Sequence, residues 1–255
     1  NELGMICFSA PFDETAVEFL ESLDVPAYKI ASAEIIHLPL LEKVAATGKP
    51  LIISTGMATV SEIDEAIRKI RNSGCEQFVL LKCTSTYPAT ASNTNILTIP
   101  HMRELFGCEV GLSDHTMGVG VSVASVALGA TVIEKHFTLS HDHEGPDHLA
   151  SLLPEDLGDM VKSIRRTEKA LGSSIKKPTK SENKTKLQVR KGLYARCKIS
   201  KGEKIGDLHI AILRPVNSVP PEMYWDVIGQ HSPIDISPGE SLDQLYKHQS
   251  IKKGS

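Results

Sequence analysis

Short runs of apolar residues alternate with longer segments in which apolar residues recur every three or four positions, from the start of the chain to about residue 171. A continuous apolar run is typical of a strand buried on both faces, and the longer period is typical of an amphipathic helix. The pattern predicts six parallel strands, at residues 5–8, 27–32, 51–54, 78–82, 108–112 and 131–136. It predicts helices over residues 14–23, 39–47, 62–72, 100–106, 119–130 and 154–171.

Polar residues gather at the carboxyl end of every predicted strand. In a closed barrel of eight parallel strands, the active site is built from the loops at this end. An open parallel sheet instead concentrates its site where the strand order reverses. We therefore expect a (β/α)8 TIM barrel whose first two β/α units are absent from this chain, with an open sheet as the alternative. Asp13 and Ser61 are the expected N-caps of the helices that follow them.

The composition changes after residue 175, which we take as the end of the partial barrel domain (1–175). Residues 176–191 are polar and basic and are predicted to form a solvated linker. Residues 192–247 contain short β-like runs separated by Gly and Pro, which predicts a small, mostly-β domain, and 248–255 form a tail. A domain of this size gains stability by docking on another surface.

The composition argues against nucleic-acid binding and against membrane insertion. The formal net charge of −3 gives no basic footprint for nucleic acid. No apolar run approaches the ~20 residues that span a bilayer, so we expect no membrane insertion. The five cysteines form no CxxC pair, which favours reduced thiols and a cytoplasmic protein. Cys7 and Cys83 lie in apolar runs, where we expect them to be buried.

Two histidines, His115 and His136, follow neighbouring predicted strands. Carboxyl ends of adjacent parallel strands meet at one edge, so the two imidazoles are expected to converge there. Neutral imidazole is a good ligand for Mn²⁺, Zn²⁺ and similar ions. A divalent-metal site is therefore predicted, although a single histidine at a strand end is more often a structural hydrogen-bonding group.

Several segments carry a family likeness. In order along the chain they are YKIASAE (Tyr28–Glu34), PLIISTGM (Pro50–Met57), KCTSTYP (Lys82–Pro88), GLSDHT (Gly111–Thr116), EKHFT (Glu134–Thr138) and GPDH (Gly145–His148). Together they resemble the sialic acid synthase family, which includes N-acetylneuraminate, legionaminic and pseudaminic acid synthases. The C-terminal segment KGLYARCKISKGEKI with ILRP resembles the antifreeze-like (SAF) domain of these enzymes.

The resemblance implies a reaction. The family condenses phosphoenolpyruvate (PEP) with the open-chain aldehyde of an N-acylated hexosamine, which releases phosphate and gives a nine-carbon 2-keto sugar acid. It implies a divalent metal, with Mn²⁺ first and Mg²⁺, Co²⁺ or Zn²⁺ as alternatives, and a homodimer with exchanged SAF domains. The alternatives are another PEP-dependent synthase of 3-deoxy sugar acids, or a non-catalytic accessory protein of polysaccharide biosynthesis on the same scaffold.

The resemblance also implies roles for individual residues. His115 and His136 would bind the metal, and the SAF-domain residue Arg214 would reach the substrate of the partner subunit. Glu34, Asp147 and Lys29 are the expected catalytic residues, the two carboxylates through sugar recognition or proton transfer. The residues expected to bind PEP or sugar are Lys29, Ser32, Ser54, Ser113, Tyr87 and Arg214. Read without the resemblance, each is compatible with an ordinary surface or strand-end position.

Overall fold

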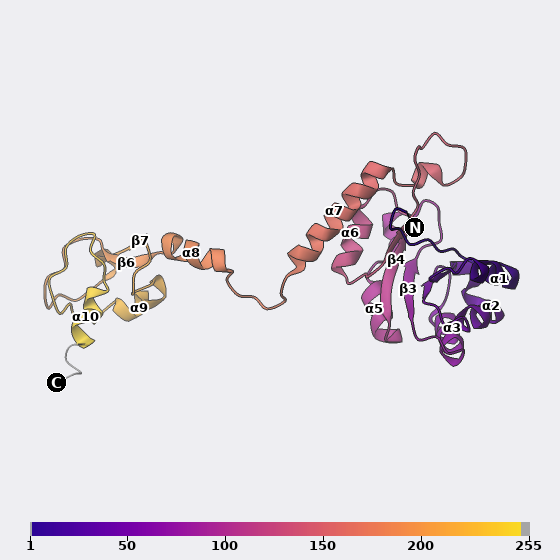
Figure 1. The fold of residues 1–255 in the computed structure, drawn as a ribbon. Coiled ribbons are helices and arrows are strands. Elements are labelled where there is room, and N and C mark those ends of the chain that lie inside the picture. The colour runs from indigo at the N-terminus through magenta and orange to yellow at the C-terminus, as the bar shows by residue number, and fades with distance from the viewer. Residues whose placement is uncertain (1, 251–255) are drawn as a thin grey trace. The chain divides into compact units, whose positions relative to one another are not determined.

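The computed structural model describes residues 2–250, and the chain divides between Ser174 and Ile175 into two compact units (Figure 1). This division lies beside the boundary expected after residue 175. Among the described residues, no helix is both long enough and apolar enough to cross a membrane.

A five-stranded parallel sheet forms the centre of the first unit. Its order follows the chain: β1 (Tyr28–Ile30), β2 (Leu51–Ser54), β3 (Phe78–Cys83), β4 (Glu109–Asp114) and β5 (Ile133–Lys135). The order never reverses, whereas an open doubly wound sheet reverses at its switch point. The sheet is therefore a partial barrel of the TIM-barrel type, and five of the six predicted strands are confirmed.

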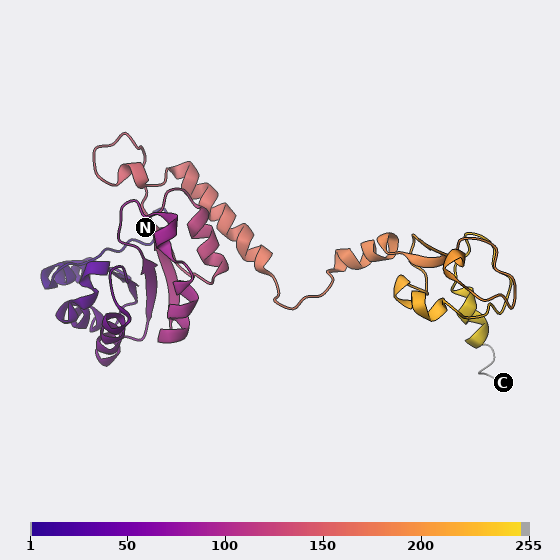
Figure 2. The ribbon, with the colours of Figure 1, turned by 180° about the vertical axis from the view of Figure 1, so that it is seen from behind.

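Helices connect the strands and flank the sheet, as Figures 1 and 2 show from opposite sides. All six expected helices form: α1 (Glu14–Ser22), α2 (Leu38–Ala45), α3 (Val60–Asn72), α5 (Thr98–Phe106), α6 (Gly120–Ala127) and α7 (Pro154–Leu171). A short helix, α4 (Ala91–Thr94), and the 3-10 helices η1 (Ser32–Ile36) and η2 (His148–Ala150) complete the unit. Asp13 caps α1 as expected. Thr59, not Ser61, caps α3, because its hydroxyl accepts from the backbone of Glu62 while the Glu62 carboxylate accepts from the backbone of Thr59.

The prediction of a strand over residues 5–8 is wrong. A single parallel bridge joins Ser9 to Tyr28, and Met5 and Ile6 are 70% and 75% exposed. No other described strand lies on the far side of this segment, so its apolar side chains have no layer to pack against. Cys7 is exposed as well, contrary to expectation, while Cys83 is buried as expected.

Alternate residues of the strands point toward the helices and build the core. Tyr28, Ile30, Leu51, Ile53, Leu80, Val110 and Leu112 are buried there with residues of α2, α3 and α5. The residues between them point the other way. Because successive side chains of a strand alternate between its faces, this burial fixes which strand residues face the interior of the partial barrel.

The second unit has its own core around Leu193, Ile199, Ile210 and Ile236. It contains α8 (Lys180–Val189), an antiparallel pair formed by β6 (Gly192–Ala195) and β7 (Ile210–Leu213), η3 (Asp207–His209), η4 (Pro221–Met223), α9 (Tyr224–Val227) and α10 (Gln244–Ser250). The predicted linker 176–191 is almost wholly exposed but carries α8, whose N-terminus is held by a Thr179–Glu182 capping box. Isolated bridges, rather than further strands, join the remaining loops.

Candidate active site

A cavity of about 380 Å³ lies at the carboxyl ends of the five strands. Each strand, or the loop after it, contributes to the wall. The lining residues are Lys29, Ala31, Ser32, Ala33, Ser54, Met57, Cys83, Ser85, Tyr87, Ser113, His115, Glu134 and His136. Eight of the residues singled out from the sequence are thus brought together: Lys29, Ser32, Ser54, Ser113, Tyr87, His115 and His136 on this wall, and Asp147 beside His136.

Lys29 enters the cavity because its neighbours on β1 are committed to the core. Tyr28 and Ile30 are fully buried on the helix side, which turns Lys29 inward. Its ammonium donates to Ser54 Oγ at 2.7 Å and lies 3.5 Å from Glu134 Oε2. Burial lowers the pKa of Lys29, and the nearby Glu134 carboxylate partly opposes this shift.

Small hydroxyl groups surround this lysine. Ser113 donates to Glu134 Oε1 at 3.2 Å, and the backbone N–H of Gly56 donates to Ser32 Oγ at 3.0 Å. A Cβ on Gly56 would collide with the hydroxyls of Ser32 and Ser85, so this position needs glycine. A partly buried cation with hydroxyl groups nearby is suited to a phosphate or carboxylate group.

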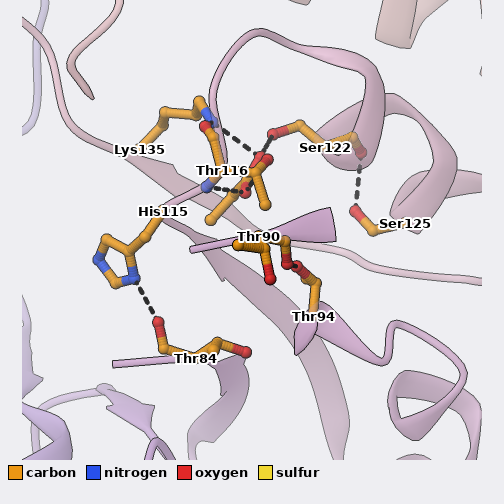
Figure 3. Close-up of polar contacts among 9 residues, drawn as sticks. Thr84, Thr90, Thr94, His115, Thr116, Ser122, Ser125 and Lys135 are labelled. Atoms are coloured by element: carbon orange, nitrogen blue, oxygen red, sulfur yellow. Dashed lines mark hydrogen bonds and ion pairs between the residues drawn. The ribbon is translucent and has the colours of Figure 1, made fainter. Parts of the chain in front are cut away.

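The two histidine rings lie next to each other on the cavity wall, with their planes inclined at 61°. Their ring centroids are 5.2 Å apart, and the ring of Tyr87 lies 4.3 Å from that of His115 and 5.6 Å from that of His136. His115 Nδ1 is 3.1 Å from the carbonyl oxygen of Thr84, which only accepts, so Nδ1 carries the hydrogen (Figure 3). The lone pair of His115 therefore resides on Nε2, on the side of the ring away from this bond.

His136 has an acidic neighbour. Its Nδ1 lies 3.7 Å from Asp147 Oδ2, and both residues line a small hollow together with Tyr87, Asp114 and His115. A metal-binding histidine usually directs its second ring nitrogen to a carbonyl or carboxylate, as His115 does toward Thr84. No group of three or more His, Cys, Asp or Glu within residues 2–250 is arranged to hold a metal, so a divalent ion at this pair would have to take its other ligands from substrate or water.

Two of the expected residues lie away from this wall. Glu34 is on η1, where its carboxylate is 3.4 Å from His37 Nδ1, and it is not among the lining residues. Arg214 belongs to the second unit, where its Nε donates to the carbonyl oxygen of Val189 at 2.7 Å.

Sequence reasoning missed Glu134, Cys83 and Ser85, all of which line the cavity. Strand alternation is the signal that identifies them: Glu134 lies two residues before His136, and Ser85 lies two after Cys83. Burial raises the pKa of the Cys83 thiol, but hydrogen bonding with His115, Ser32 and Ser85 outweighs it, and the pKa falls to about 7. Cys83 is thus a polarised part of the cavity wall rather than an inert core thiol.

Comparison with known proteins places this geometry in a family. Residues 1–176 match the model of the NeuB family. The N,N'-diacetyllegionaminic acid synthase of Campylobacter jejuni is 42% identical over 224 residues, 87% of this chain and 67% of that protein. The pseudaminic acid synthase of Helicobacter pylori is 38% identical over 230 residues, 90% of this chain and 68% of that protein.

Solved structures agree. The N-acetylneuraminic acid synthetase of Leptospira borgpetersenii superposes with a TM-score of 0.68 at 33% identity, over 72% of this chain and 64% of that one. The spore coat polysaccharide biosynthesis protein spsE of Bacillus subtilis gives a TM-score of 0.64 at 34% identity, over 96% of this chain and 74% of that one. The chain spans about two thirds of the length of these relatives.

Proposed function

We propose, because the chain belongs to the NeuB family, that it condenses phosphoenolpyruvate with the open-chain aldehyde of an N-acylated hexosamine. The product is a nine-carbon 2-keto sugar acid of the sialic, legionaminic or pseudaminic type, and inorganic phosphate is released. The observation that carries the proposal is one cavity in which a partly buried lysine beside several hydroxyl groups lies on the same wall as two neighbouring imidazoles.

Lys29 has the role of binding PEP. Its ammonium, with the hydroxyls of Ser32, Ser54 and Ser113, neutralises and orients the carboxylate and phosphate groups. The Glu134 carboxylate forms an ion pair with the Lys29 ammonium and so keeps this side chain in place before PEP binds. PEP is thereby held with its methylene carbon directed at the sugar aldehyde.

His115 and His136 have the role of holding a divalent cation, with Mn²⁺ first among the candidates. Such an ion supplies Lewis-acid polarisation of the aldehyde when it is bound. The methylene carbon of PEP bonds to the aldehyde carbon, and the aldehyde oxygen takes up a proton to become a hydroxyl. Water adds at C2, and the C2–O bond to phosphate breaks, which releases inorganic phosphate and leaves the 2-keto group. The added water must lose a proton, and the carboxylate of Asp147, next to His136, is positioned to accept it.

Tyr87, which is 57% exposed and lines the cavity, is assigned to contact with the sugar. Glu34 is assigned to sugar binding or proton transfer from the loop after β1, outside the wall itself. Arg214 is assigned to substrate binding across a homodimer with exchanged SAF domains, in a cytoplasmic enzyme. Arg214→Ala is expected to raise the KM for PEP or sugar, and unchanged kinetics would remove this assignment.

Phosphate release tests the reaction. PEP is incubated with Mn²⁺ and a panel of N-acyl hexosamines that includes N-acetylmannosamine and 2,4-diacetamido sugars, and a nine-carbon acid is sought by mass spectrometry. Release with arabinose 5-phosphate but with no member of the panel would favour a 3-deoxy sugar acid synthase instead. Mn²⁺ binding without consumption of PEP by any acceptor would favour a non-catalytic accessory protein.

A further inference from the structure

A buried ion pair lies directly behind the two histidines, on the face of the sheet away from the cavity. Lys135 Nζ is 2.9 Å from Asp114 Oδ2, and the two side chains are 3% and 0% exposed. Asp114 and Lys135 face each other in the β4–β5 ladder. Asp114 directly precedes His115, and Lys135 directly precedes His136. The two histidines therefore follow a pair of residues that lie opposite each other in neighbouring strands.

Hydrogen bonds extend the ion pair around His115. Asp114 Oδ1 accepts from the backbone N–H and the hydroxyl of Thr116, at 2.8 and 2.7 Å. Lys135 Nζ donates to the carbonyl oxygen of Thr116 at 2.5 Å. The residues before and after His115 are therefore fixed to each other and to the residue before His136.

A helix anchors the same network. Ser122 of α6 donates to Asp114 Oδ2 at 2.6 Å. Figure 3 shows Lys135, Thr116 and Ser122 converging from three elements, while the ring of His115 points the other way, toward Thr84.

Stability alone is a weak explanation for this arrangement. Removing two charges from water is costly, and apolar side chains of similar volume generally stabilise a fold as well as a buried ion pair does. An apolar pair cannot form oriented hydrogen bonds. The Asp114 carboxylate and the Lys135 ammonium form such bonds with Thr116 and so fix the backbone on both sides of His115.

We infer that Asp114 and Lys135 are positioning residues that set the separation and orientation of His115 and His136. The inference rests on the proposed function, in which this histidine pair holds the divalent cation. Neither positioning residue lines the 380 Å³ cavity, and Asp114 borders only the small hollow beside His136. Partners behind a metal ligand typically contribute about 10- to 100-fold in metal affinity.

The experiment separates positioning from stability. Mn²⁺ affinity is measured by the loss of the free-ion electron paramagnetic resonance signal, and stability by urea unfolding, for D114N, K135M and the double variant D114N/K135M. Each single variant leaves one buried charge or donor unpaired and is expected to be less stable. The double variant is expected to recover most of that stability while its Mn²⁺ affinity stays about 10- to 100-fold weaker.

A double variant that regains both stability and Mn²⁺ affinity, to within about twofold of wild type, would overturn the inference, because a merely structural pair behaves in this way. Glu109→Gln removes a charge at the exposed, opposite end of β4 and is expected to leave the Mn²⁺ affinity unchanged.

His115→Ala distinguishes a failure of the metal assignment from a failure of the positioning role. If wild type binds Mn²⁺ no better than His115→Ala, the metal assignment fails and the inference fails with it. If wild type binds better and D114N/K135M matches wild type, the inference alone fails.

Discussion

Replacing Lys29 with methionine tests the binding of PEP most directly. The substitution keeps the length and most of the apolar stem but removes the ammonium that Ser54 and Glu134 hold in place. Hydrogen bonds to charged groups contribute about 1.5–3 kcal/mol, so the affinity for PEP is expected to fall about 10- to 150-fold. The unpaired Glu134 carboxylate would then face the anionic ligand, which places the effect toward the upper end of this range.

Two measurements report the loss. Isothermal titration with PEP in the absence of sugar gives the affinity directly, and phosphate release at saturating sugar gives the KM for PEP. Lys43→Met is the matched control, because Lys43 is also an ion-paired lysine of the first unit but lies on α2, outside the cavity wall. An affinity for PEP that is the same in Lys29→Met as in Lys43→Met would refute the anion-binding role.

Three further predictions concern the fold. Gly111→Ala places a Cβ against the carbonyl oxygen of Val132, and the overpacking is expected to cost about 1–3 kcal/mol in urea unfolding. Thr59→Ala removes the capping box of α3 and is expected to cost about 1 kcal/mol in the same assay. Hydrogen bonds from Lys49 and Tyr28 lower the pKa of Glu21, so its charge stabilises the fold at neutral pH and this stabilisation is lost as the pH falls below about 4.5. The stability difference between wild type and Glu21→Gln should therefore shrink between pH 6 and pH 3.

The glycine and capping predictions each have a control substitution of the same kind. Gly158 lies within α7 with open space around its Cβ position, so Gly158→Ala should be neutral or stabilising. Ser61→Ala should have little effect on stability, since Ser61 lies inside α3 rather than at its cap. Equal losses in Gly111→Ala and Gly158→Ala, or a larger loss in Ser61→Ala than in Thr59→Ala, would contradict the packing and capping described above.

The sequence predicted the elements whose signals are local. The apolar runs of β1 to β5 and the periodicity of the helices act within a few residues, so these elements could be identified directly, although the cap of α3 proved to be Thr59 and not Ser61. Residues 5–8 carry the same apolar signal, but a strand also needs neighbours on the sheet, and one bridge at Ser9 is all that this segment has. Pairing is non-local, which is why the same signal succeeded five times and failed once.

The residues of the candidate site also divide into those with a local signal in the sequence and those that depend on strand pairing. Residues that follow a strand end as part of a polar cluster, such as Ser32 and His115, were predictable because parallel strands bring their carboxyl ends together. Glu134 was missed because a carboxylate inside a strand looks like a solvated surface group until its register with Ser113 is known. The ion pair of Asp114 and Lys135 depends on the same register.

Successive residues of a strand point to opposite faces of the sheet, so cavity-lining residues and ion-paired residues can alternate at the same strand ends. Along β4 and its exit, Ser113 and His115 face the cavity while Asp114, between them, faces α6. Along β5, Glu134 and His136 face the cavity while Lys135 lies behind. The register of β4 and β5 pairs Ser113 with Glu134 on the cavity side and Asp114 with Lys135 on the helix side. One register therefore fixes both pairs. A one-residue slip of β5 would bring Lys135 into the cavity and remove both the ion pair and the neighbouring imidazoles at once. The register that buries the ion pair is therefore the same register that forms the histidine pair.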